Sequence, residues 1–199
     1  VAAEDTGRSE EIEQKQIQFI NFSFSRSGTN PIEEIKTLKQ FFNLYRKIKP
    51  DVVHHITLKP VTYGSIIAKI LKTKGVVNAV SGLGYNFTGD RQGFVQRMMI
   101  RLMRFGFDRD NLTVIFQNAD DQKALEMLGI VSSRNKIVRI KGSGVDLNKF
   151  SKSKFPPYDR IKVVLPIRML WDKGVRELKK ASDLLNEKYR NRLQFVLSG

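Results

Sequence analysis

Short apolar segments alternate with longer amphipathic segments along most of the chain, and this pattern restricts its fold more than any other feature. The segments expected as strands span residues 51–56, 76–80, 112–116 and 136–140, and those expected as helices between them span 63–73, 93–105 and 118–128. Short strands rich in Val and Ile that alternate with helices are typical of a parallel sheet covered by helices on both faces. The sequence therefore predicts the α/β fold class, with a Rossmann-like parallel sheet.

Two further elements are expected before this series. Residues 16–24 read as a strand, and Asn30 and Pro31 read as the N-cap and the first residue of a helix. Apolar residues then recur at helical spacing as far as Ile48. Because a doubly wound sheet normally has a strand and a phosphate-facing loop before a strand such as 16–24, we expect the opening strand of this domain to be missing.

A second strand–helix series begins after a proline-rich segment. Pro156 and Pro157, flanked by Ser and Lys, predict a linker at residues 151–159. A strand, a helix and a strand are expected after it, at residues 161–167, 174–189 and 193–197. We therefore expect a first Rossmann-like domain in residues 1–150 and an incomplete second one in residues 160–199.

The charge of the chain indicates an anionic partner. The 199 residues carry a formal net charge of +15, of which +14 falls in residues 51–199. Nucleic acid, an acidic membrane surface and phosphorylated substrates all suit such an excess, and composition does not distinguish them. The absence of cysteine from the sequence excludes a disulfide framework, a zinc–thiolate site and a thiol nucleophile, which fits a reducing, cytosolic setting.

Two adjacent histidines, His54 and His55, lie in the expected strand 51–56, and Lys59 lies in the loop beyond it. Successive side chains of a strand point to opposite faces, so one histidine at most can face a ligand. A purely structural role, with one histidine buried and the other exposed, is the alternative. Histidines at adjacent strand positions cannot bind one metal ion together, so we expect no metal site here.

Glycines follow two other expected strands. Ser81, Gly82 and Gly84 come after one of them, and Gly142 and Gly144 come after another. Glycine permits a tight turn and a close approach of the backbone to a ligand, although either loop can also be a simple connection. Because ligands bind beyond the carboxyl ends of the strands in open α/β sheets, we expect these loops at the ligand-binding edge.

The second series carries a candidate phosphate site. Arg168, Lys173 and Gly174 follow its first strand and precede its helix, which is where a small clamp for a diphosphate would lie. Solvated charges at a strand end are the alternative. Asp108 and Asp110 match the Asp-x-Asp metal motif of some sugar transferases, but they lie in a polar loop without partner ligands, and we read them as a chance match.

The segment 93–107 combines cationic and apolar residues in an unusual way. On a helical wheel Arg97, Arg101 and Arg104 form a narrow stripe, and Met, Phe, Leu and Val occupy the remaining positions. This pattern is typical of a helix lying in an anionic membrane interface, and a core helix with one solvated face would show the same wheel. Nucleic acid is not expected as a partner, because the aromatic residues are not interleaved with the basic ones as a stacking platform requires.

Five segments together resemble a known family. In chain order they are HHITLKPVTYGS, VVNAVSGLGY, VIFQNADD, GSGVDLNKF and RMLWDKG. They resemble the GT-B glycosyltransferases of family 4, and within them the bacterial enzymes of O-antigen, capsule and other polysaccharide biosynthesis. The resemblance covers about residues 16–199 and implies a fold of two Rossmann-like domains.

The resemblance implies a retaining, metal-independent enzyme that moves a sugar from a nucleotide-sugar, its donor substrate, to a glycan acceptor linked to polyprenyl diphosphate. It implies no cofactor. The enzyme would be peripheral on the cytoplasmic face of the cell membrane. Arg168 and Lys173 would hold the donor diphosphate with Gly174, and Lys59 and the glycine loops would face the acceptor side of the cleft.

The match to the family is incomplete in places. We expect His54 and Ser81 to act at the reaction centre. Many members have His-Gly where this sequence has Ser81-Gly82, so the role of that histidine does not carry over to this position. The Glu-rich donor motif of the family has no counterpart, so the chain reads as a fragment truncated at both ends and inactive alone. The alternative function is a non-catalytic basic α/β module that binds anionic membrane or nucleic acid.

Overall fold

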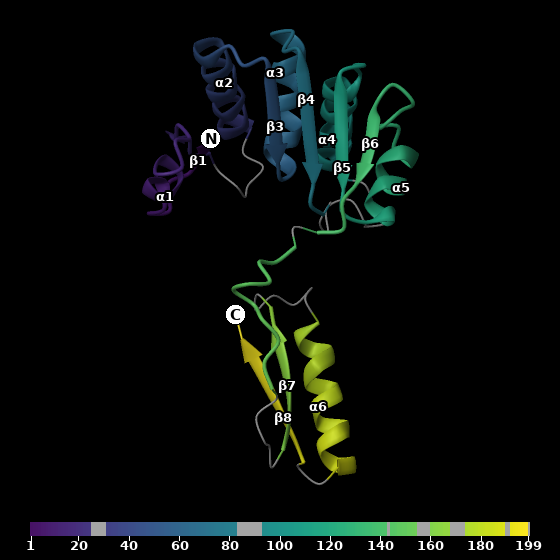
Figure 1. Cartoon of the computed structure of the whole chain (residues 1–199). Helices are drawn as coiled ribbons and strands as arrows, with labels where there is room; N and C mark the ends of the chain where they lie inside the picture. Colours follow the sequence, from purple (N-terminus) through teal and green to yellow (C-terminus); the bar gives the residue numbers. More distant parts are fainter. Residues whose placement is uncertain are drawn as a thin grey trace. The chain divides into compact units, whose positions relative to one another are not determined.

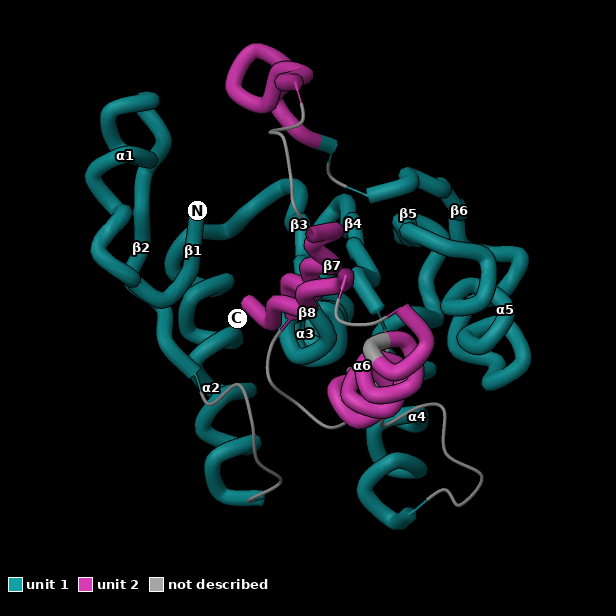
Figure 2. Tube along the Cα trace, turned by 90° about the horizontal axis from the view of Figure 1, so that it is seen from below, with its two compact units in different colours: residues 1–144 teal, residues 145–199 magenta. Residues whose placement is uncertain are grey.

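The computed structural model describes residues 1–24, 31–82, 93–142, 144–154, 160–167, 174–189 and 192–198, without the side chain of residue 186. The chain divides into two compact units, residues 1–144 and residues 145–199, which Figure 2 shows in teal and magenta.

A parallel sheet of four strands forms the centre of the first unit (Figure 1). Its strands are β3 (Val52–Ile56), β4 (Gly75–Val80), β5 (Leu112–Phe116) and β6 (Lys136–Arg139), and they lie side by side in chain order. This confirms the α/β class with parallel strands. The expected limits of these strands agree with the observed ones to within a residue, because β-branched runs bounded by Gly, Asp and Asn define short strands clearly.

The sequence predicts helices on both faces of this sheet, but the described helices cover one face. They are α2 (Pro31–Ile48), the π-helical turn η1 (Pro60–Gly64), α3 (Ser65–Ile70) and α4 (Phe94–Phe107), and α5 (Ala119–Met127) adds Leu125 to the same core. Alternate strand residues such as Val53, Val76 and Val114 are buried under them. The other face is more open, since Val52 and Ile56 of β3 are 63% and 55% exposed.

The region before α2 differs from the sequence-based expectation. A strand over residues 16–24 is wrong, because only β2 (Ile20–Asn21) forms there, paired in parallel with β1 (Ala2–Ala3). Gln16 adopts a left-handed backbone with φ of 59°, which interrupts an extended run. The Phe22 ring instead packs edge-on against the ring of Phe41 in α2, with 4.9 Å between the two ring centres. A short helix, α1 (Ser9–Glu13), connects β1 to β2.

Proline and asparagine residues mark where two of the helices begin. The helix expected from residue 63 begins earlier, because η1 runs directly into α3, with Pro60 at the first position of the turn. Asn118 caps α5 as expected, and its side-chain oxygen accepts a hydrogen bond of 2.7 Å from the Asp121 N–H. The expected cap Asn30 lies outside the described residues.

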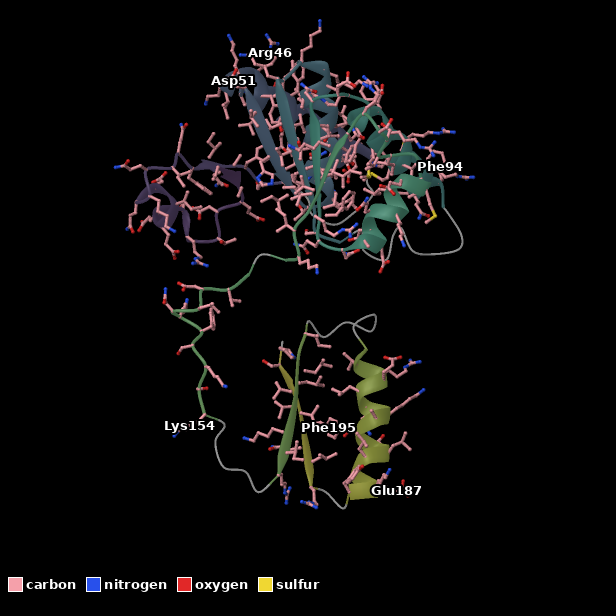
Figure 3. All side chains as sticks on the ribbon, turned by 45° about the vertical axis from the view of Figure 1, so that its right-hand side comes forward. Arg46, Asp51, Phe94, Lys154, Glu187 and Phe195 are labelled. Atoms are coloured by element: carbon pink, nitrogen blue, oxygen red, sulfur yellow. The ribbon has the colours of Figure 1, made fainter. Side chains whose placement is uncertain are left out.

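The second unit contains one β-α-β motif. Its elements are β7 (Ile161–Pro166), α6 (Val175–Tyr189) and β8 (Leu193–Ser198), and the two strands pair in parallel. In Figure 3 Phe195 of β8 lies on the side of the strands that faces α6. The expected strand–helix–strand series is confirmed, with the strands and the helix within a residue of their expected limits.

Candidate functional site

The carboxyl ends of β3 to β6 point to one edge of the sheet, because all four strands are parallel (Figure 1). Four connections leave the strands there, beginning at Thr57, Ser81, Gln117 and Ile140. This is the edge at which open α/β sheets bind ligands. The residues singled out in the connections after β3, β4 and β6 therefore meet at one edge, although their sequence positions are far apart.

Three glycines at this edge have backbones that other residues rarely adopt. The φ angles are 105° for Gly82, 80° for Gly142 and 71° for Gly144. Among the residues that the structure describes, a Cβ atom at any of the three would meet no atom within 4 Å, so the described surroundings leave open space. Glycine is needed here for the conformation and not for tight packing, and it leaves the backbone accessible to a ligand. Gly84 lies outside the described residues.

Ser81 and Lys59 occupy different environments at this edge. Ser81 is exposed beside Gly82. The Lys59 ammonium instead forms an ion pair of 2.7 Å with Glu34 of α2, and both side chains are less than one fifth exposed. The Tyr63 hydroxyl donates to the other oxygen of the Glu34 carboxylate at 2.5 Å. Burial, and then this carboxylate, raise the pKa of Tyr63. Lys59 thus holds the loop after β3 against α2.

The two histidines have opposite surroundings. His54 is exposed on the open face of β3, whereas His55 is 4% exposed beneath the helices. Its Nε2 lies 2.5 Å from the Tyr45 hydroxyl and its Nδ1 lies 2.7 Å from Oδ1 of Asn78. Burial lowers the pKa of His55 to about 4, so the ring is neutral near pH 7. His55 has the structural role that was the alternative for this pair.

Asn78 extends this buried network and was not singled out in the sequence. It faces His55 in the register of β3 and β4, and its Nδ2 donates to Ser65 Oγ at 2.8 Å. The network joins α2, β3, β4 and the start of α3, directly below the candidate edge. An asparagine inside an apolar strand segment was the available signal, because a buried amide needs hydrogen-bond partners.

The exposed face of α4 combines the expected arginines with apolar side chains. Phe94, Val95, Met98 and Phe105 are 72%, 49%, 45% and 48% exposed. Figure 3 labels Phe94 at the edge of the first unit. On the helical wheel Phe94, Met98 and Phe105 lie next to the stripe of arginines, so the two kinds of side chain share one face. Ile100, Met103 and Phe107 form the buried face. We refer below to the exposed residues Phe94, Val95, Arg97, Met98, Arg101, Arg104 and Phe105 as the α4 face.

The three arginines of this face do not have equal freedom. Arg104 donates from Nε to the Leu128 carbonyl at 2.8 Å and so satisfies a carbonyl at the end of α5. Arg97 and Arg101 have no side-chain partner within the part of the chain that the structure describes. The charge available to a ligand on the α4 face therefore comes mainly from these two arginines.

The candidate phosphate clamp of the second unit is only partly described. Gly174 precedes α6 with a left-handed φ of 80°, so a glycine is favoured at this entry to the helix. Arg168 and Lys173, the two cations of the clamp, lie outside the described residues.

The Asp-x-Asp sequence lies at the opposite edge of the sheet, where the strands begin. Arg134 forms ion pairs with both Asp108 and Asp110, and Lys69 adds a contact of 2.9 Å to Asp108. These cations lower the pKa of both carboxyl groups. Across the described ranges no group of three or more metal-ligating side chains comes together. Nor does any described helix have the length and apolarity to cross a membrane.

Comparison with known proteins gives a match over the first unit. The family model described as glycosyl transferase 4-like matches residues 1–118, which is more than half of the chain. A curated relative is the N,N'-diacetylbacillosaminyl-diphospho-undecaprenol alpha-1,3-N-acetylgalactosaminyltransferase of Campylobacter jejuni. It is 28% identical over 201 residues, which cover 92% of this chain and 50% of the relative. The chain therefore spans about half the length of this relative.

Among solved structures, MurG of Acinetobacter baumannii has a TM-score of 0.43 and 12% sequence identity. The match covers 98% of this chain and 55% of MurG. At this TM-score and identity, nothing about the function of the chain follows from the match.

Proposed function

The chain belongs to the glycosyl transferase 4-like family, and we propose that it acts in the transfer of a sugar from a nucleotide-sugar to a glycan acceptor linked to polyprenyl diphosphate. The reaction proposed is retaining and independent of metal. The observation that carries the proposal is the similarity of 92% of the chain to a relative whose name specifies a diphospho-undecaprenol-linked acceptor.

The geometry of the first unit supports an acceptor-side role. Gly82, Gly142 and Gly144 keep backbone accessible in open space at the edge where parallel sheets bind ligands. We assign the acceptor to this edge. Ser81 is the candidate side chain at the edge itself, whereas His54 lies on the open face of β3, two residues before the strand ends. Lys59 acts in this proposal by fixing the loop, because Glu34 already holds its charge.

The second unit supplies the donor side in this proposal. Arg168 and Lys173 would contact the diphosphate of the nucleotide-sugar and stabilise the negative charge that develops on the leaving group. The proposed domains are an acceptor-side domain in residues 1–150, a linker in residues 151–159 and the start of a donor-side domain in residues 160–199. The reaction needs no pair of catalytic carboxylates of the kind that glycoside hydrolases use.

Donor binding tests the clamp. In a chain completed with the rest of a donor-side domain, titration with uridine and guanosine diphosphate sugars should give binding that Arg168→Ala weakens about tenfold or more, because a charge-assisted contact to phosphate is lost. Arg160→Ala, an exposed arginine before β7, is the matched control and should bind as the unsubstituted chain does. Equal donor affinity of the chain and its Arg168→Ala variant would contradict the clamp.

We further propose that the α4 face rests on an anionic membrane, which would bring the edge loops to a lipid-linked acceptor. Exposed Phe94, Met98 and Phe105 can enter the headgroup region while Arg97 and Arg101 contact lipid phosphates. This arrangement makes the protein peripheral on the cytoplasmic side, where nucleotide-sugars are supplied.

Vesicle sedimentation tests the membrane proposal. Arg97→Glu combined with Arg101→Glu should abolish most binding to vesicles that contain phosphatidylglycerol, since each basic residue near the surface contributes about 1 kcal/mol. Lys47→Glu combined with Lys49→Glu, at the exposed end of α2, changes the net charge equally and should bind far better. Equal loss in both double variants would show that only net charge matters and would refute a specific α4 face.

A further inference from the structure

A hollow of about 350 Å³ lies at the amino ends of the strands, at the edge of the sheet opposite the glycine loops. Figure 3 labels Asp51, the residue directly before β3, at this edge. The hollow lies between the end of α3, the loop after α4 and the loop before β6. Its lining side chains are Lys69, Lys72, Thr73, Asp108, Arg109, Asp110, Asn111 and Arg134.

The carboxylates in this lining are already paired. Asp110 receives two hydrogen bonds from Arg134, at 2.7 and 3.0 Å, and a third nitrogen of Arg134 bonds to Asp108. Lys69 donates to the side chain of Asp108 at 2.9 Å and to its carbonyl at 2.7 Å. Two cations and two carboxylates therefore neutralise one another along one side of the hollow.

Arg109 has no such compensation. The residue is 8% exposed, and among the described residues its guanidinium donates only to neutral oxygens, those of the Asn111 side chain and the Thr73 carbonyl, both at 2.5 Å. Its remaining nitrogen, Nη1, is buried and has no acceptor within the described part of the chain. Burial lowers the pKa of Arg109, which is the expected response of a cation without a nearby counter-charge. A buried cation without a counter-charge is costly, so an anion held in the hollow would stabilise the fold through its charge.

Lys72 adds a second uncompensated cation. It follows the end of α3 with a left-handed φ of 54°, its side chain lines the hollow, and it forms no ion pair with any described residue. Four cationic and two anionic side chains line the hollow, which leaves an excess of two positive charges. Lys72 and Arg109 are the source of that excess.

We propose that this hollow is a binding site for a phosphate group. A phosphate oxygen accepts strong hydrogen bonds from ammonium and guanidinium groups, and the excess of positive charge matches a phosphate monoester or diester. The site is separate from the edge at which the acceptor is proposed to bind. Its existence does not depend on the glycosyltransferase proposal.

Two sources of phosphate fit the position of the hollow. The Lys69 ammonium lies 4.7 Å from the centre of the Phe105 ring, and Phe105 belongs to the α4 face. A phospholipid headgroup at a membrane under the α4 face could therefore reach Lys72. A soluble phosphate or phosphate ester from solution could occupy the hollow equally well, and the chemistry of recognition is the same.

Isothermal titration of the 199-residue chain with inorganic phosphate and with glycerol 3-phosphate tests the soluble source. Lys72→Gln should weaken binding about tenfold, because one charge-assisted hydrogen bond is lost, and Lys72→Arg should restore most of it. The matched control is Lys74→Gln, two residues away, because Lys74 is paired with Asp51 and does not line the hollow. Lys72 is exposed, so its replacement leaves the buried contacts of Arg109 in place.

Flotation with vesicles that contain phosphatidic acid, against vesicles of phosphatidylcholine alone, tests the lipid source. Weaker binding of Lys72→Gln than of Lys74→Gln to the acidic vesicles, with no binding of soluble phosphate, would assign the site to a headgroup. Soluble binding that depends on Lys72 would assign it to a free phosphate. If Lys72→Gln and Lys74→Gln behave alike in both assays, the proposal is overturned. That result would leave the α4 face intact, since its own test uses Arg97 and Arg101.

Discussion

His54 and His55 are adjacent in the sequence and have different physical roles, because successive side chains of a strand point to opposite faces. His55 is enclosed by Tyr45, Asn78 and Gly64, and a Cβ atom at Gly64 would lie 2.8 Å from Cε1 of its ring. The ring fits only because residue 64 has no side chain. The position in the strand therefore decides whether a histidine is exposed to a ligand, as at His54, or buried in the core, as at His55.

The buried His55 predicts a loss of stability in acid. Its pKa is about 4 when folded and about 6.5 when unfolded, so the unfolded chain binds the proton more readily. The stabilising effect of the neutral ring is complete above about pH 6.5 and is lost as the pH falls to about 4. Urea unfolding across this range should show a loss of up to about 3 kcal/mol from this group.

Two histidine variants separate this effect from other titrations. His55→Gln should be less stable at pH 7, and its stability should depend less on pH between 6.5 and 4 than that of the unsubstituted chain. His54→Gln, at the exposed neighbouring position, should keep the full dependence. If stability depends on pH equally in both variants, the neutral state of His55 is not the cause of the loss of stability in acid.

The ion pair between Lys59 and Glu34 predicts a coupling between α2 and the loop after β3. Lys59→Met and Glu34→Gln should each destabilise the chain, because each leaves a poorly solvated partner. A double-mutant cycle by thermal unfolding should give a coupling energy of about 1 kcal/mol or more. Additive effects would instead mean that the two groups do not interact and that Glu34 does not hold the loop after β3 through Lys59.

Helices α3 and α4 approach one another closely at Gly106. A Cβ atom at Gly106 of α4 would lie 3.0 Å from Cβ of Ser65 and 3.1 Å from the backbone nitrogen of Ile66. Both neighbours belong to α3, so relief of the clash would require one helix to move. This contact keeps the buried face of α4 against the core and leaves the α4 face toward solvent.

Gly106→Ala should therefore destabilise the protein, although alanine is the better helix former. Helix propensity favours the change by about 1 kcal/mol, and overpacking opposes it by about 1–3 kcal/mol, so a net loss of about 1 kcal/mol is expected. Chemical denaturation measures the difference. At Gly93, the N-cap of α4, a Cβ atom would meet no described atom within 4 Å, so Gly93→Ala should change stability by less than about 1 kcal/mol. A more stable Gly106→Ala variant would show that the helices are not in close contact there.

At the scale of the molecule, the hydrophobic core belongs to one unit. All buried apolar residues of the described chain lie between Phe41 and Val131, within the unit of residues 1–144. Residues 145–199 form one β-α-β motif, in which no described residue is fully buried. The two units therefore differ in how much of their stability can come from their own packing.

This difference predicts how the two units behave when separated. A fragment of residues 1–144 should unfold cooperatively with a midpoint close to that of the whole chain, since it keeps the entire core. A fragment of residues 145–199 should show no cooperative transition, because a motif of this size buries too little apolar surface. Circular dichroism melts of both fragments measure this. A cooperative melt of the smaller fragment would mean that its strands and helix suffice for a core.

The order and type of most elements could be predicted from the sequence. Periodicity and turn residues are local signals, and they gave the strands β3 to β6, the helix from Pro31 to Ile48 and the β-α-β motif within a residue or two. They failed at residues 16–24, where Phe22 packs on Phe41 and leaves only two residues in a strand. Packing between distant segments overrode the local preference there.

The sequence by itself determined the α/β class, and five segments in order indicated the family. The parallel strands then placed three glycines, in the two loops after β4 and β6, at one edge of the sheet. Only the tertiary structure decided that His55 is the buried histidine, that Lys59 is held by Glu34, and that Arg109 and Lys72 carry uncompensated charge. The reason is physical: strand and helix formation follow neighbouring residues, whereas burial and charge pairing depend on contacts such as Lys59 with Glu34, 25 residues apart.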